Sequence, residues 1–152
     1  MIPAILTNAR QDDLRIVNIE WDSMGFYAFI AVFSGAGFGA CLRWWLGITL
    51  NHIFPALPLG TLAANLIGGY LIGVAVAYFS LNASLPPEVR LLVITGFMGA
   101  LTTFSTFSIE IVTLITRGQF SWALAAVGAH LLGSLAMTAL GILTVHRFLL
   151  RD

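Results

Sequence analysis

Residues 96–108 read GFMGALTTFSTFS, and this segment decides how the rest of the chain is interpreted. It lies in apolar sequence, yet it holds five hydroxyl side chains and three phenylalanines around two glycines. A membrane-spanning helix satisfies its own backbone hydrogen bonds and presents apolar side chains to lipid. Glycines followed by β-branched threonines are poor helix formers, so the segment predicts a helix that is broken near its middle. Irregular backbone at membrane depth requires cover from protein or a water-filled cavity, which makes this segment the first candidate for a functional site.

The composition is that of an integral membrane protein. The 152 residues are 59% hydrophobic and only 9% charged, whereas a soluble domain carries about 25% charged residues. A formal net charge of zero and the lack of lysine leave no basic patch, which argues against a nucleic-acid partner. The single cysteine, Cys41, excludes an intramolecular disulfide and a cysteine-rich metal site. Its place in an apolar run predicts a small buried side chain.

Four apolar stretches are long enough to cross a bilayer, which takes roughly 20 residues. We predict an all-α membrane domain over residues 24–152. Its spans are expected at about 24–50, 59–79, 89–116 and 121–150. Residues 1–23 mix charged and apolar residues without the pattern of a signal peptide, so we expect a surface or disordered extension outside the membrane. The arginines near the spans favour one side only slightly, so such a chain could insert in both orientations.

Polar side chains recur at helical spacing in the second and fourth spans. Thr61 and Asn65 are four residues apart, and so are His130, Ser134 and Thr138. Residues at this spacing share one helix face, so each stripe is expected to face another helix or a cavity instead of lipid. Hydrogen bonds between helices, or from a hydroxyl to its own helix, would also explain these stripes.

The first span carries two further features. Residues 35–40 read GAGFGA, a small-residue face that predicts close approach of another helix. Arg43 follows, next to two tryptophans. It is interpreted either as an arginine that extends to the membrane interface or as a buried one that pairs or draws anions toward an entrance.

The polar residues inside the spans do not suit catalysis, because no acid is tied by spacing to a serine and histidine pair. Neutral donors instead suit a small permeant solute that loses part of its water. Hydroxyl hydrogens and the ring edges of Phe104 and Phe107, one turn apart, suit an anion, although core packing also explains two such phenylalanines. Glu110 would repel an anion unless it is protonated or oriented by hydroxyls. These residues alone therefore lead only to a small polar solute.

Three stretches closely resemble the Fluc (CrcB) family of fluoride channels: residues 35–43, GAGFGACLR; 60–65, GTLAAN; and 96–110, GFMGALTTFSTFSIE. The resemblance runs through all four spans, from about residue 26 to 148, and its TTFSTF core is highly specific. It implies a channel of the bacterial inner membrane that exports cytoplasmic fluoride passively and so relieves fluoride toxicity. It also implies an antiparallel, dual-topology homodimer with two fluoride pores and a structural sodium ion at its centre.

The resemblance assigns roles to single residues. The residues that match the family's pore are Phe104, Phe107, Asn65, Ser105, Thr106, Glu110, Ser134 and Thr138. The central sodium would be held by the backbone carbonyls of Gly99 and Thr102 from both copies, and carbonyl oxygens suit a hard cation. Arg43 would lie at a pore entrance. The chain departs from the family where Gly99 is followed by Ala100 instead of a second glycine, and its N-terminal extension is longer.

Two other readings remain at this stage. A proton-coupled exporter resembling the small multidrug resistance transporters would also have four short spans and dual topology. Those transporters need a glutamate in the first span, where this chain has Arg43; its candidate is Glu110 in the third. A subunit that assembles without transporting would use the polar stripes only to hold helices together.

Overall fold

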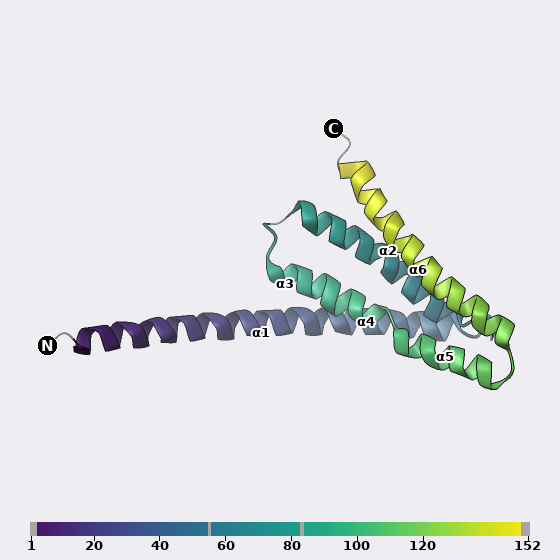
Figure 1. The fold of residues 1–152 in the computed structure, drawn as a ribbon, viewed down its shortest axis with the longest axis horizontal. Coiled ribbons are helices and arrows are strands. Elements are labelled where there is room, and N and C mark those ends of the chain that lie inside the picture. Colours follow the sequence, from purple (N-terminus) through teal and green to yellow (C-terminus); the bar gives the residue numbers. More distant parts are fainter. Residues whose placement is uncertain (1–2, 55, 83, 150–152) are drawn as a thin grey trace.

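The computed structural model describes the backbone of residues 3–54, 56–82 and 84–149, and all of its regular elements are helices (Figure 1). In chain order they are α1 (Pro3–Leu50), α2 (Leu59–Leu81), α3 (Pro87–Arg90), the π-helix η1 (Leu91–Met98), α4 (Gly99–Leu101), α5 (Phe104–Thr116) and α6 (Phe120–Leu149). Burial and side-chain contacts are described from Gly25 onward.

Four helical segments are long and apolar enough to cross a membrane: Gly25–Leu50, Leu59–Leu81, Pro87–Thr116 and Phe120–Leu149. Their bounds lie within two residues of those of the four predicted spans, and residue 150, the predicted end of the last span, lies outside the described ranges. The protein is thus an all-α, multi-pass membrane protein. The first and third spans run in one direction, and α2 and α6 return beside them (Figure 1).

The N-terminal extension is not separated from the first span. Helix α1 begins at Pro3, so the backbone of residues 3–23 is helical and leads directly into the membrane segment (Figure 1). Residues 1–2 lie outside the described part of the chain, and the position of the extension relative to the membrane stays a prediction.

Helix α1 packs against the third span through glycine. A Cβ atom at Gly35 would collide with the carbonyl oxygen of Leu92 and lie 2.8 Å from the amide nitrogen of Phe97. A Cβ atom at Gly96 would lie 2.6 Å from the carbonyl oxygen of Val32. The two backbones approach closely because neither glycine carries a side chain, which confirms the packing face predicted in the first span.

Helices α2 and α6 pack in the same way. A Cβ atom at Gly73 would collide with the carbonyl oxygen of Thr138, and one at Gly141 with that of Tyr70. A Cβ atom at Gly69 would lie 3.0 Å from the carbonyl oxygen of Ser134. The polar stripes of the second and fourth spans therefore face each other. The spacing predicted that each stripe faces a helix or a cavity, and the contact between these two helices is seen only in the structure.

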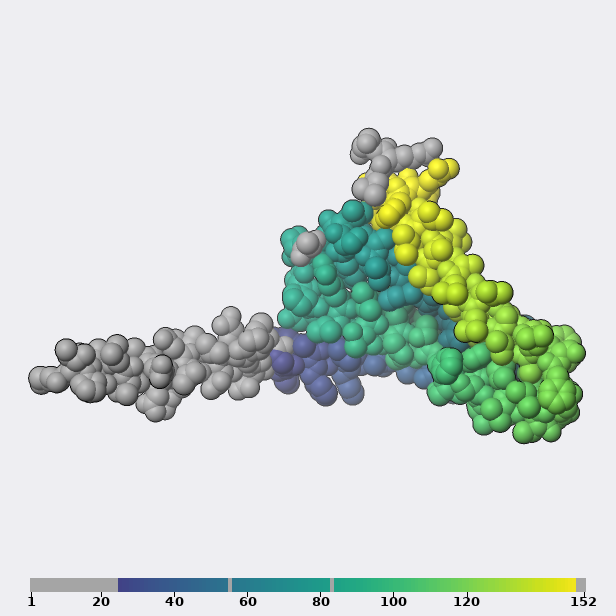
Figure 2. All heavy atoms as spheres, in the orientation of Figure 1, coloured from purple at the N-terminus to yellow at the C-terminus, as the bar shows by residue number. Residues whose placement is uncertain are grey.

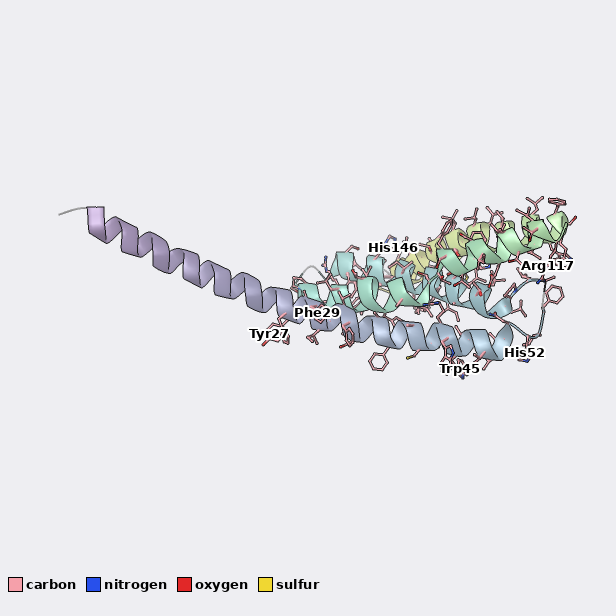
Figure 3. The ribbon with its side chains drawn as sticks, turned by 90° about the horizontal axis from the view of Figure 1, so that it is seen from below. Tyr27, Phe29, Trp45, His52, Arg117 and His146 are labelled. Atoms are coloured by element: carbon pink, nitrogen blue, oxygen red, sulfur yellow. The ribbon has the colours of Figure 1, made fainter. Side chains whose placement is uncertain are left out.

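The outer faces of the helices are apolar. Figure 3 shows Tyr27 and Trp45 projecting from α1 away from the other helices, and Figure 2 shows α6 along one flank of the molecule. Cys41 is exposed on α1, so the prediction of a buried cysteine is wrong: its helix face points away from the bundle. In a membrane such faces meet lipid or a second protein surface, so their exposure carries no solvation penalty.

Candidate functional site

The candidate site is built around a change of backbone conformation in the third span. Helix α4 ends at Leu101 and α5 begins at Phe104. Between them Thr102 (φ −77°, ψ 151°) and Thr103 (φ −147°, ψ 117°) have extended backbone. The π-helix η1 precedes this point, and π-turns within helices often occur near functional sites. Nothing in the sequence pattern predicted that π-helix.

The side chain of Asn65, on α2, holds the extended backbone in place. Its Oδ1 accepts a hydrogen bond of 2.7 Å from the amide of Thr103. Its Nδ2 donates to the carbonyl oxygen of the same threonine at 3.1 Å. The amide thus pairs with both polar groups of one residue, as a neighbouring β-strand would, and replaces hydrogen bonds that a continuous helix would supply.

The hydroxyl of Thr103 caps the helix that follows. It accepts a hydrogen bond from the amide of Thr106 at 3.2 Å and donates to the hydroxyl of Thr106 at 2.9 Å. The hydroxyl of Ser105 lies 3.3 Å away. Threonine is a favourable N-cap because its oxygen satisfies an amide at the first turn. Three hydroxyls therefore gather at the start of α5.

Two backbone carbonyls at the same place lose their helical partners. In a continuous α-helix the amide of Thr103 would donate to the carbonyl of Gly99, and that of Thr106 to the carbonyl of Thr102. Both amides donate to side-chain oxygens instead. No residue within the described ranges donates a hydrogen bond to either carbonyl oxygen. These are the two carbonyls that the resemblance assigned to a sodium ion.

A cavity of about 500 Å³ adjoins this backbone between the second, third and fourth spans. Its lining includes predicted site residues from all three: Asn65, Gly99, Thr102, Phe104, Phe107 and Ser134. His130 of α6 also lines it. The rings of Phe104 and Phe107 lie 5.5 Å apart between centroids and are tilted by 54°. The ring of Phe107 packs on the imidazole of His130 at 4.8 Å.

A second cavity, of about 590 Å³, lies between α1, α2 and α5. Arg43, Asn51, Thr61, Thr103 and Thr106 are among the residues that line it. Because Thr103 and Thr106 stand beside the extended backbone, the hydroxyl cluster at the start of α5 borders this space. The two cavities share Thr103 as a lining residue.

Arg43 lines this second cavity and Glu110 is not among its lining residues, but both are hydrogen-bonded to neighbouring spans. The Nε of Arg43 donates to the carbonyl oxygen of Ala100 at 2.9 Å. The hydroxyl of Thr61 donates to a carboxylate oxygen of Glu110 at 2.6 Å. The structure therefore favours the interpretation of Arg43 as a buried arginine, since its side chain is partly buried and its guanidinium is hydrogen-bonded to the third span. Glu110 accepts a hydrogen bond from a hydroxyl. Orientation by a hydroxyl is one of the two conditions under which this acid could lie near an anion's path, the other being protonation.

Not every predicted pore residue lines one of the cavities. Thr138 donates to the carbonyl oxygens of Gly69 and Ser134, at 3.0 and 2.9 Å, and so stabilises the contact between α2 and α6.

Asn51 was not among the predicted site residues. Its Oδ1 accepts hydrogen bonds from the amides of Gly60 and Thr61 at 2.8 and 3.3 Å, and it so caps the start of α2 from outside that helix. An asparagine directly before a proline-containing turn was the available signal.

Comparisons with known proteins agree on one family. The sequence model of the family described as "CrcB-like protein, Camphor Resistance (CrcB)" matches residues 30–142. The chain is 64% identical to a "Fluoride-specific ion channel FluC" of Nitrosospira multiformis over 122 residues, which cover 80% of this chain and 95% of that relative. It is 60% identical to a protein of the same name from Burkholderia mallei over 124 residues, covering 82% and 97%. The chain belongs to the CrcB family.

Proposed function

We propose that this protein is a fluoride-selective channel that lets cytoplasmic fluoride leave the cell passively and so relieves fluoride toxicity. The names of its relatives support this proposal. Proteins up to 64% identical to this chain are named fluoride-specific ion channels. The family is one of transporters and not of enzymes. The bacterial inner membrane is the proposed location, since fluoride accumulates in the cytoplasm when neutral HF crosses and dissociates.

The observation that carries the proposal is the concentration of polar donors at the only extended backbone of the four spans within the described ranges. Hydroxyls of Thr103, Ser105 and Thr106 meet there beside two cavities. The rings of Phe104 and Phe107 line the first cavity. Hydroxyl hydrogens and the positive edges of aromatic rings can replace the water that a small anion loses.

We further propose that two antiparallel copies form the channel and that each copy contributes to two pores. Phe104 lines the first cavity yet is 73% exposed, and Leu131 and Leu135 on the same cavity are 50% and 69% exposed. A cavity whose lining residues are this exposed fits a face that a second copy covers in the membrane. Insertion in both orientations agrees with the slight arginine bias of the sequence.

A structural sodium ion at the centre of the dimer is part of the same proposal. The carbonyl oxygens of Gly99 and Thr102 fit it, because both amides that would bond them in a continuous helix are diverted to side chains. Unpaired carbonyls are suitable ligands for a hard cation. Ala100 follows Gly99 directly, and its carbonyl oxygen accepts from Nε of Arg43 instead.

The proposal is tested by fluoride efflux from liposomes that contain only the purified protein. We expect rapid fluoride efflux, followed with a fluoride electrode, and chloride efflux at the rate of protein-free liposomes. The protein needs no nucleotide and no imposed proton gradient. An absence of fluoride efflux from protein that elutes as a single species would contradict the channel and favour a subunit that assembles without transporting.

Replacement of Glu110 by glutamine distinguishes the channel from a proton-coupled exporter. Glutamine keeps an oxygen that can accept from the Thr61 hydroxyl, so a channel is expected to lose no more than about tenfold in fluoride efflux, the size of one net hydrogen bond. A proton-coupled exporter would lose transport altogether, because it depends on a titrating carboxylate. Thr61→Val is the matched variant, since it removes the donor and leaves the carboxylate.

A further inference from the structure

The first turn of α2 is capped by a residue of the preceding helix. In an α-helix the first amides have no partner within the helix. The earliest amide to make a regular helical bond in α2 is that of Leu62, which donates to the carbonyl oxygen of Pro58 at 3.2 Å. Pro58 stands at the N-cap position and makes no side-chain hydrogen bond. The amides of Gly60 and Thr61 instead donate to Oδ1 of Asn51, at 2.8 and 3.3 Å.

Asn51 is itself held at the end of α1. Its backbone amide donates to the carbonyl oxygen of Gly47 at 3.1 Å, which continues the helical hydrogen-bonding pattern one residue beyond Leu50. The two helices also touch at this point, because a Cβ atom at Gly60 would collide with the carbonyl oxygen of Leu46. The same Cβ atom would lie 2.7 Å from Oδ1 of Asn51. The end of α1 therefore fixes the position of the first turn of α2.

Thr61 connects this first turn to the third span. The residue is 4% exposed, and its hydroxyl donates to a carboxylate oxygen of Glu110 at 2.6 Å. A threonine inside a helix can donate to the carbonyl four residues earlier in its own helix, as Thr113 does to Ile109. Leu57, four residues before Thr61, lies outside α2. The hydroxyl is thus left to bond with α5, and its direction follows from the position of the first turn.

We propose that Asn51 is a positioning residue, which holds the first turn of α2 so that the hydroxyl of Thr61 meets Glu110. Its effect on the carboxylate passes through the two backbone amides that donate to it. Asn51 and Thr61 both line the second cavity, so the same cap fixes a side chain that borders this space. That an anion passes near Glu110 rests on the proposed function, whereas the order of these contacts does not.

Two substitutions at Asn51 separate the cap from the rest of the side chain. Asn51→Leu removes the acceptor, so the first turn of α2 is expected to open and the hydroxyl of Thr61 to move away from Glu110. Asn51→Asp keeps the acceptor, and a carboxylate is favourable at a helix N-terminus. The matched control is Asn82→Leu. Asn82 also follows directly after a span, but its side chain donates within its own helix, to the carbonyl oxygen of Tyr78 at 2.9 Å.

Hydrogen exchange of the purified protein, followed by mass spectrometry, tests the cap without any transport. In the parent, residues 60–62 are expected to exchange slowly although they belong to the first turn of a helix. Asn51→Leu should raise their exchange rate by about tenfold, the size of one net hydrogen bond, and Asn51→Asp and Asn82→Leu should leave it unchanged. Equal rates in Asn51→Leu and the parent overturn the cap. Fast exchange of residues 60–62 in the parent or in Asn51→Asp overturns it as well, including where Asn51→Leu fails to assemble.

The infrared absorption of the Glu110 carboxyl group reports on its hydrogen bond with Thr61. The difference between the spectra of the parent and of Glu110→Gln identifies this band. Thr61→Val removes the hydroxyl, and Asn51→Leu is expected to shift the band in the same direction and to a similar extent. Asn82→Leu should leave the band in place. A band that moves in Thr61→Val but not in Asn51→Leu overturns the positioning role, because a cap that only stabilised α2 would give that result.

Fluoride efflux from liposomes relates the same contact to conduction. Asn51→Leu and Thr61→Val are each expected to lower efflux by about three- to tenfold, as for the loss of one net hydrogen bond. In the double variant the loss should equal that of Thr61→Val within about twofold, since residues that act through one contact are not additive. Losses that multiply mean that Asn51 acts by another route and overturn the inference. A parent that conducts no fluoride overturns the proposed function, while the exchange rates and the infrared band still decide the role of Asn51.

Discussion

Gly35→Ala is expected to destabilise the folded protein by about 1–3 kcal/mol, with loss of the properly assembled form at the upper end. The added methyl group would collide with the carbonyl oxygen of Leu92 and approach the amide nitrogen of Phe97 to 2.8 Å. Both are backbone atoms, so no side-chain rotation relieves the overlap. The first span would have to move away from the third, and close backbone approach is the main source of helix association in a membrane.

The measurement is the fraction of detergent-solubilised protein that still elutes as one species after heating. For a chain of this size we expect the midpoint of that loss to fall by roughly 5 °C or more. Gly37→Ala is the matched control, since it lies two residues away on the same helix and a Cβ atom there meets nothing within 4 Å. Equal midpoints for the two variants would contradict the close contact between α1 and the third span.

The sequence predicted the fold well because membrane spans depend on properties that single residues carry. Apolar length gave four spans to within two residues. Spacing by four correctly placed Asn65 and His130 on faces that meet another helix, since helix periodicity fixes which residues share a face. The small-residue face that includes Gly35 predicted a close contact for the same reason.

The other features of the fold and the site depend on contacts between spans, and the periodicity within one span does not predict such contacts. Glycines and threonines indicated irregular backbone in the third span, but the two extended residues are set by the amide of Asn65, 38 positions away from Thr103. The cap that Asn51 gives α2 likewise crosses a loop. Cys41 was placed in the core because its neighbours are apolar, although in a membrane protein apolar faces also point outward.

Phe107→Ile and Phe104→Ile are each expected to lower fluoride efflux at least about tenfold, while chloride efflux stays at background. Isoleucine keeps most of the apolar volume but has no ring edge with positive partial charge. If the anion passes the two rings, each replacement raises the barrier by at least about 1.4 kcal/mol, which is tenfold in rate. Efflux from liposomes, normalised to the amount of folded protein, measures this effect.

Phe33→Ile is the matched control, because Phe33 lies on α1 with 68% of its surface exposed and is not among the residues that line either cavity. It should retain the efflux of the parent. Phe104 is 73% exposed in a single copy whereas Phe107 is 8% exposed, so Phe107→Ile leaves a small void and its elution profile must match that of the parent. Parental efflux in both ring variants would mean that the anion takes another path, and the hydroxyls around the second cavity would then be the groups to replace. Loss of efflux in both, with correct assembly, would identify the rings as the part of the pore that replaces water, because a hydroxyl path alone would not respond to the change from phenylalanine to isoleucine.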